Sequence, residues 1–290
     1  MTLPHNFGGP WTQAKLEALQ KYLRAYMQIF TKNEKAKYFT TVYVDAFAGT
    51  GYRTITDKDE QFLFKDLQEE DNQQFLKGSA RIALELDPPF QRYVFIEKDP
   101  HHAAELQRQC ANFPDRTYQI LPGDAGKILP QWIGQTDWRT TRAVVFLDPY
   151  GMQVEWSLIE AIANTKAIDL WLLFPLGMAV NRLLTRNHLP PPAWRDKLDQ
   201  FFGTPDWLER FYNVERDMFG HDYVSKKGSW HEISDFFNKR LQGLFPAVAK
   251  PRVLANSRGN PLYLLCFAAG NKKGGATALK IANHILEHTN

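Results

Sequence analysis

Hydrophobic residues follow two spacings along this chain, and the two alternate. Apolar residues recur at helical spacing from 11 to 30, which predicts a helix before the first strand. Short runs rich in β-branched and aromatic residues predict strands at 39–47, 92–97, 117–121, 143–147 and 168–174. Helical patterns separate these runs at 80–86, at 100–111 behind an Asp99-Pro100 cap, after Asp124, and at 155–164. Such alternation predicts an α/β fold, with a mostly parallel sheet and helices on both faces.

The pattern changes between 177 and 245, where it is mainly helical and aromatic and is broken by three prolines at 190–192. The aromatic residues here are expected to form the core of a small module, with a wall for a planar substrate as the alternative. A further strand is predicted at 261–269 and a last helix at 275–287. We therefore expect a Rossmann-like core from 1–176 and 246–290, and a helical module at 177–245 that binds substrate or a partner.

Residues 52–77 interrupt this organisation. They hold seven acidic and four basic residues and have no clear period. They lie between a glycine turn and the helix that starts at Gly78-Ser79, so we interpret them as an inserted loop or lid.

The composition narrows the class of protein. Hydrophobic residues make up 44% of the chain and charged residues 23%, which is ordinary for a globular protein. No apolar run is long enough to span a membrane, no secretory signal is recognisable, and the two cysteines lack metal or redox spacing, so a reducing cytoplasm is expected. Residues 226–290 hold ten basic and three acidic residues. This basic third suits a nucleic acid, although an ordinary solvated surface explains it equally well.

Acidic residues follow four successive strands, where the ligands of open α/β sheets bind. They are Asp45, Glu97, Asp124 and Asp148. One such residue is commonly a helix cap, but four in order predict a pocket with a negatively charged rim.

The turn after the first strand carries Gly49 and Gly51, which would let the backbone approach a ligand. A nicotinamide site would have a third glycine, but Thr54 occupies that position. No Gly-Lys-Ser/Thr phosphate loop is present either. An NAD-dependent enzyme is therefore the weaker interpretation.

A cationic nucleoside, S-adenosylmethionine, fits a negative rim better than a phosphate does. Glu97 lies about 20 positions beyond the glycines once 52–77 is set aside, and would accept hydrogen bonds from both ribose hydroxyls. Asp124 would accept from the adenine amino group or cap the next helix, and Asp45 would hold the amino-acid end. Phe47, Lys98 and Ala125 complete the predicted cofactor site, although Lys98 could instead pair with Glu97.

Asp148-Pro149-Tyr150 is the most specific feature. Methylation of an exocyclic amine is difficult because its lone pair is delocalised into the ring. A carboxylate and a backbone carbonyl that accept the two N–H groups would orient the nitrogen, while the tyrosine stacks on the base. Proline would fix the direction of the carbonyl. The alternative is a simple Asp-Pro turn.

The sequence resembles class I methyltransferases, and its Asp-Pro-Tyr-Gly is similar to the Asp-Pro-Pro-Tyr motif of enzymes that methylate amines of nucleic acids, without the second proline. More closely, it resembles the three-Cys-motif partner protein family over nearly the whole chain. The matching positions are Trp11, Lys15, Leu16, residues 45–49, Gly78-Ser79, Glu97, Gly123-Asp124, residues 146–151 and Pro261-Leu262-Tyr263. The resemblance implies a Rossmann-like methyltransferase fold and a partner protein related to radical enzymes.

Together these patterns predict an S-adenosylmethionine-dependent methyltransferase that acts on an amine or hydroxyl of a nucleic acid or nucleotide. No metal site is expected. The alternative is a non-catalytic subunit that binds the cofactor or a nucleic acid to assist another enzyme.

Overall fold

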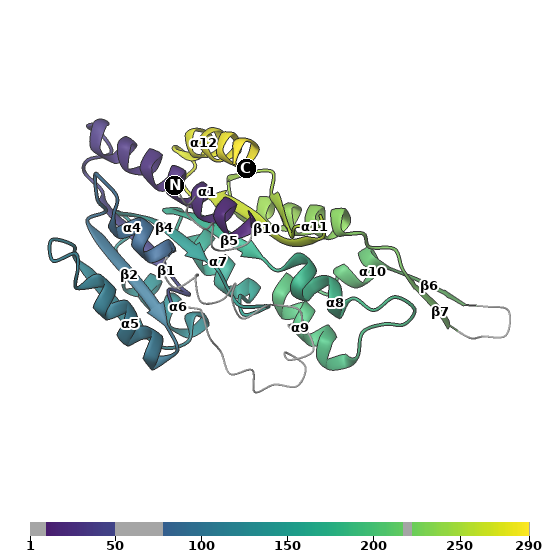
Figure 1. The fold of residues 1–290 in the computed structure, drawn as a ribbon. Coiled ribbons are helices and arrows are strands. Elements are labelled where there is room, and N and C mark those ends of the chain that lie inside the picture. The colour runs from purple at the N-terminus through teal and green to yellow at the C-terminus, as the bar shows by residue number, and fades with distance from the viewer. Residues whose placement is uncertain (1–9, 50–77, 217–221, 290) are drawn as a thin grey trace, which may run out of the picture.

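Eight strands form one twisted, mostly parallel sheet at the centre of the molecule (Figure 1). This computed structural model describes residues 10–49, 78–216 and 222–289. The strand order is β3-β2-β1-β4-β5-β10-β8, and β9 pairs with β10. The parallel strands are β1 (Thr40–Asp45), β2 (Arg92–Glu97), β3 (Tyr118–Pro122), β4 (Thr141–Leu147) and β5 (Ile168–Phe174). β10 (Pro261–Ala269) runs antiparallel to β5, β8 (Ala247–Val248) and β9 (Arg252–Ala255).

Helices cover both faces of this sheet. α1 (Pro10–Lys32) contacts α4 (Ser79–Leu84) and α12 (Gly275–His288), and Figure 1 shows α1 and α12 side by side at the top. A second set joins α6 (Ala125–Gln135) to α7 (Trp156–Asn164), which also contacts α9 (Pro192–Phe202) and α11 (Trp230–Leu244). α5 (Pro100–Cys110) packs on β2 and β3. Two covered faces explain why every residue of β5 is buried.

The order β3-β2-β1-β4-β5 is that of a Rossmann-like sheet. With the antiparallel β10 beyond β5, the chain has the Rossmann-like class I methyltransferase fold that the sequence predicts. The predicted strands at 92–97, 168–174 and 261–269 agree with β2, β5 and β10 at both ends.

The segment from 177 to 245 is less helical than its pattern indicates. After the π-helix η2 (Leu176–Val180) come α8 (Asn181–Leu183), α9, α10 (Trp207–Phe211) and α11, but β6 (Tyr212–Arg216) and β7 (Asp222–Lys226) form an antiparallel hairpin that was not predicted. β8 and β9 were not predicted either. The aromatic residues of the segment do form core, since Phe201, Phe202 and Trp207 are buried. The Phe237 ring lies 4.2 Å from that of Phe174 in β5, so this core continues into the sheet.

Two further properties of the structure concern the state of the cysteines and the search for membrane-spanning helices. Cys110 and Cys266 are buried and form no disulfide. Burial raises the pKa of the Cys110 thiol to about 11. Of the helices in the described part of the chain, none has the length and apolar character needed to span a membrane.

Candidate functional site

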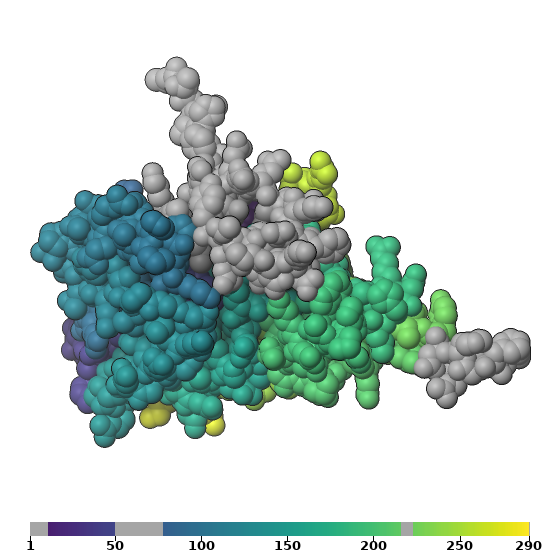
Figure 2. All heavy atoms as spheres, turned by 90° about the horizontal axis from the view of Figure 1, so that it is seen from below, coloured from purple at the N-terminus to yellow at the C-terminus, as the bar shows by residue number. Residues whose placement is uncertain are grey.

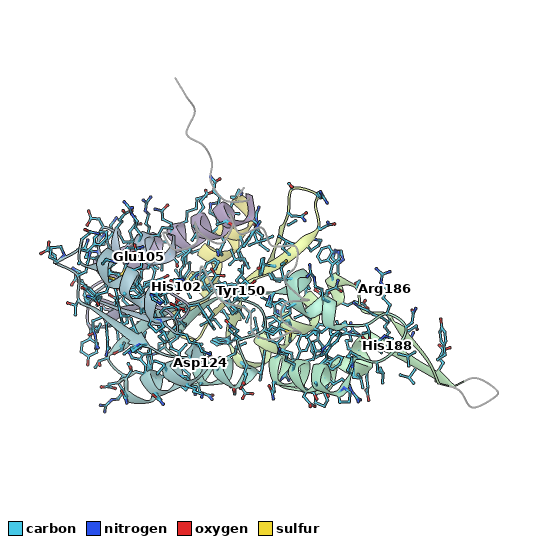
Figure 3. The ribbon with its side chains drawn as sticks, turned by 60° about the horizontal axis from the view of Figure 1, so that its bottom comes forward. His102, Glu105, Asp124, Tyr150, Arg186 and His188 are labelled. Atoms are coloured by element: carbon cyan, nitrogen blue, oxygen red, sulfur yellow. The ribbon has the colours of Figure 1, made fainter. Side chains whose placement is uncertain are left out.

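The structure brings the four predicted carboxylates to one edge of the sheet. β1, β2, β3 and β4 are parallel neighbours, and Asp45 and Glu97 are the last residues of β1 and β2. Asp148 directly follows β4, and Asp124 lies two residues beyond β3. Their carboxyl groups therefore surround the same end of the strands. Figure 3 labels Asp124, His102 and Tyr150 in this region.

Glu97 is the carboxylate most clearly arranged for a ligand. It is 5% exposed, and its Oε1 accepts a hydrogen bond from the Asp99 backbone N–H at 2.7 Å. Among the described residues nothing donates to its Oε2, which is buried. A Cβ on Gly49 would lie 2.7 Å from this Oε2 and 2.9 Å from the His102 Cβ. Glycine at 49 is therefore required by the carboxylate beside it, and no side chain at that position fills the space in front of Oε2.

Asp124 caps helix α6, which is one of the two roles that the sequence left open for it. Its Oδ1 accepts from the Gly126 N–H at 3.0 Å, at the start of α6. Its Oδ2 accepts from Lys98 Nζ at 3.3 Å, so Lys98 pairs with Asp124 and not with Glu97. Ala125 is buried at the first position of α6. A role for Asp124 in binding adenine, and for Lys98 and Ala125 in the cofactor site, stays a prediction.

Asp148 is paired with a buried lysine from the first helix. Lys15 Nζ donates to Asp148 Oδ2 at 2.5 Å, and Lys15 has no exposed surface. Burial lowers the pKa of Lys15, while the charges of Asp148 and Asp45 raise it. This ion pair is a fixed part of the site. Of the two carboxylate oxygens of Asp148, only Oδ1 takes no part in the pair.

The Lys15 side chain is held by aromatic residues. Its Nζ lies 5.5 Å from the centre of the Trp11 ring, which is four residues earlier on the same face of α1. Trp11 in turn stacks on Tyr263 of β10 at 4.9 Å. Leu16 lies against Gly78, where a Cβ would be 2.8 Å from the leucine Cδ1. Segments that are far apart in the sequence thus meet around Asp148.

Lys15 was not predicted as a site residue from its own chemistry, although the pattern of the first helix contains a signal for it. Trp11, Lys15, Leu19 and Tyr22 fall on one helical stripe, and all four are buried. A lysine in the middle of the apolar face of a helix requires a buried anion, because an unpaired buried charge is costly. The pattern does not say which carboxylate that is.

Asp45 is fully buried and is bound by groups of the chain itself. It accepts from the Phe47 N–H at 3.3 Å and the Tyr43 hydroxyl at 3.4 Å, and also interacts with the Ser79 side chain. Burial raises the pKa of Asp45 to about 7, and the negative charge of Asp148 adds to this, against the hydrogen bond to Ser79. Gly78, not Ser79, is the N-cap residue of α4. Asp45 therefore ties β1 to α4, and direct contact with a cofactor stays a prediction.

The turn after Asp148 presents an aromatic ring. Pro149 is buried and Tyr150 is half-buried. Gly151 has a φ of 77°, a left-handed conformation that glycine adopts without strain. Figure 3 shows Tyr150 between the strand-end residues and Arg186 of the 177–245 segment.

Two predicted features lie outside the described residues, namely Gly51 and the loop or lid at 52–77. Within the ranges that the structure describes, no group of three His, Cys, Asp or Glu side chains could hold a metal ion.

Comparisons with known proteins are limited to the fold. No protein-family model matches the sequence, and neither does any curated protein. The structure is similar to that of protein LPL1258 from Legionella pneumophila, with 11% identity, coverage of 98% of this chain and 94% of that chain, and a TM-score of 0.45. It is also similar to 1,6-didemethyltoxoflavin-N1-methyltransferase from Burkholderia thailandensis, crystallised with 1,6-didemethyltoxoflavin and S-adenosylhomocysteine. Here the identity is 11%, the coverage is 90% of this chain and 80% of that chain, and the TM-score is 0.35. At these values the similarity identifies no site residue.

Proposed function

We propose that this chain is an S-adenosylmethionine-dependent methyltransferase that acts on an amine or hydroxyl of a nucleic acid or nucleotide. One observation carries the proposal: Glu97 Oε2 is buried at the strand ends, next to Gly49, with no donor among the described residues. A buried carboxylate oxygen without a partner costs about 1–3 kcal/mol. A vicinal diol would supply the missing donors, and the ribose of a nucleoside carries one.

The charge of the rim selects among nucleosides. Asp45, Glu97, Asp124 and Asp148 surround one edge, and the two described lysines that form ion pairs there, Lys15 and Lys98, are each bonded to one of these acids. A pyrophosphate would be repelled here, whereas a nucleoside with a sulfonium and an ammonium would be attracted. S-adenosylmethionine has this charge and would supply an activated methyl group, leaving as S-adenosylhomocysteine.

The chain's own residues would position the methyl acceptor. Lys15 fixes Asp148 through Oδ2, and Oδ1 would accept a hydrogen bond from the acceptor N–H or O–H. Tyr150 would stack on a base that has left its helix, since a base within a duplex cannot reach a strand-end pocket. Lys15 also limits the charge that Asp148 brings next to Asp45.

The direct test is transfer of a radiolabelled methyl group from S-adenosylmethionine to RNA, to DNA and to free nucleotides. We expect the wild type to label one of them and Asp148→Asn to lower kcat roughly 100-fold or more, with S-adenosylhomocysteine binding retained. The exposed Asp196→Asn is the matched control and should keep full activity. Binding without any transfer by the wild type would instead support the non-catalytic subunit.

Two further expectations accompany the proposal. The resemblance to the three-Cys-motif partner family adds a partner protein related to radical enzymes. The two buried, unpaired cysteines agree with a reducing, cytoplasmic setting.

A further inference from the structure

A basic groove lies in the part of the chain that follows β5. It has a volume of about 640 Å³ and is lined by residues of α8 and the loop after it, and by the end of β7 and the turn that leads to α11. Its cationic residues are Arg182, Arg186, Lys226 and Lys227. None of the described residues that line it is an acid. We call this set the basic groove.

The positive charge is sorted into the groove and is not a property of the whole segment. Residues 177–245 hold basic and acidic residues in nearly equal number. Arg186 and Lys227 are exposed, and within the described chain neither forms an ion pair. Cations collected in a concave surface without carboxylates are typical of a binding site for a polyanion.

Lys226 of the groove is held close to the positive charge of Arg186. Lys226 Nζ donates to Asn181 Oδ1 at 2.7 Å and to the Leu184 carbonyl at 3.3 Å, which fixes it in the wall. Burial, together with the positive charge of Arg186, lowers the pKa of Lys226 to about 8. A bound anion would oppose this lowering of the pKa, because it would place a negative charge next to both cations.

The groove lies on the same side of the sheet as Asp148. η2 begins two residues after β5, and β5 pairs in parallel with β4, which ends at Leu147. Asn181 and Arg182 follow η2 directly. Figure 3 shows Arg186 beyond Tyr150, on the side away from Asp124. In Figure 2 the green residues, which include the segment that carries the groove, lie beside the teal ones.

An exposed aromatic ring extends this surface. Tyr223 of β7 is 66% exposed. Because side chains alternate along a strand, it lies on the same face of the hairpin as Ser225, which lines the groove. Bases stack on such rings without regard to sequence. An acidic polypeptide would use the cations but not the ring.

We propose that the basic groove binds the phosphodiester backbone of a nucleic-acid strand whose target base enters the site at Asp148 and Tyr150. The part of this inference that concerns the target base at Asp148 and Tyr150 rests on the proposed function. The groove supplies affinity for the backbone, and the carboxylate site supplies the chemistry.

The test compares two doubly charge-reversed variants in the binding of a fluorescent 20-nucleotide single-stranded RNA and of its DNA equivalent. Arg186→Glu/Lys227→Glu removes the two exposed cations of the groove. Lys272→Glu/Lys273→Glu makes the same change in charge at exposed residues that follow the C-terminal end of β10. That end of β10 pairs with the start of β5, so it lies at the opposite edge of the sheet from the four acids. We expect the groove variant to bind roughly 10- to 100-fold more weakly than the wild type, because it cannot form the charge-assisted hydrogen bonds to phosphate, and the control to change less than about threefold. The slope of log affinity against log salt should fall by about 0.7 for each phosphate that the groove variant no longer neutralises.

A third variant separates nucleic acid from an acidic polypeptide. Tyr223→Ala should weaken RNA or DNA binding by roughly fivefold or more, because it removes a ring on which a base stacks, and leave polyglutamate binding unchanged. Equal weakening in the two charge variants would overturn the inference, as would polyglutamate binding as tight as that of RNA and DNA. Binding of S-adenosylhomocysteine is measured alongside. If S-adenosylhomocysteine binding is intact while the groove variant still binds RNA and DNA normally, this inference alone fails. If the wild type does not bind S-adenosylhomocysteine, the proposed function fails.

Discussion

Lys15 and Asp148 form a buried ion pair across 133 positions of sequence, with Nζ and Oδ2 2.5 Å apart. The pair connects the first helix to the turn after β4, at the centre of the predicted acceptor site. Since Lys15 has no exposed surface, its charge depends on this carboxylate and on Asp45 nearby.

Lys15→Met should destabilise the protein by about 3–5 kcal/mol, because it leaves Asp148 buried without its partner. Asp148→Asn should also destabilise the protein, since it removes the carboxylate to which the buried Lys15 donates. The double variant should lose much less than the sum of the two, because neither charge remains. The free energy of unfolding in urea gives all three values.

Lys21→Met is the control for this cycle, since Lys21 pairs with Glu17 on the exposed surface of α1. It should cost less than about 1 kcal/mol. Additive losses for Lys15 and Asp148 would contradict the interpretation that the two act as one unit.

Gly49→Ala should damage the site directly. The new Cβ would lie 2.7 Å from Glu97 Oε2, so the carboxylate or the turn must move. We expect a loss of about 1–3 kcal/mol in the free energy of unfolding and weaker binding of S-adenosylhomocysteine. Gly243→Ala in α11 is the matched change, with no atom within 4 Å of its Cβ, and should leave both quantities unchanged or slightly improved. Equal behaviour of the two variants would show that position 49 has no special constraint.

Asp45 makes stability depend on pH. Because its pKa is raised from 3.8 to about 7, the folded chain holds its proton more tightly than the unfolded chain between these values. Its contribution to the free energy of unfolding therefore falls as pH rises through this window. The stability of Asp45→Asn relative to wild type should increase by roughly 2–3 kcal/mol from pH 5 to pH 8. Urea titrations across this range measure the difference, and a constant or decreasing value would contradict the assignment.

The sequence predicts the sheet well because its strands are buried runs. β2 has an apolar interior between Arg92 and Glu97, and β5 and β10 are apolar apart from Asp169, so their bounds are visible without structural information. The hairpin is different. In β6 Tyr212 is buried but Val214 is exposed, and in β7 Tyr223 is exposed, so neither strand shows a regular alternation of buried apolar and exposed polar residues.

Within the site, the strand-end acids were predictable because parallel strands end at one edge. The partners of those acids were not. Lys15 reaches Asp148, and Arg186 meets Lys226, only through tertiary packing, and local spacing carries no information about either contact. The excess of basic residues in 226–290 was visible, but Arg182 and Arg186, which complete the groove, lie outside that range.

In the proposed site, Glu97 would receive the ribose of S-adenosylmethionine. The most direct measurement is calorimetric titration of S-adenosylhomocysteine into wild type and Glu97→Gln, with the exposed Glu160→Gln of α7 as control and NADH and ATP as competing nucleotides. We predict that wild type and Glu160→Gln bind S-adenosylhomocysteine in preference to NADH and ATP, and that Glu97→Gln binds it roughly tenfold or more weakly. Tighter binding of NADH or ATP, or an unchanged affinity of Glu97→Gln, would contradict the account.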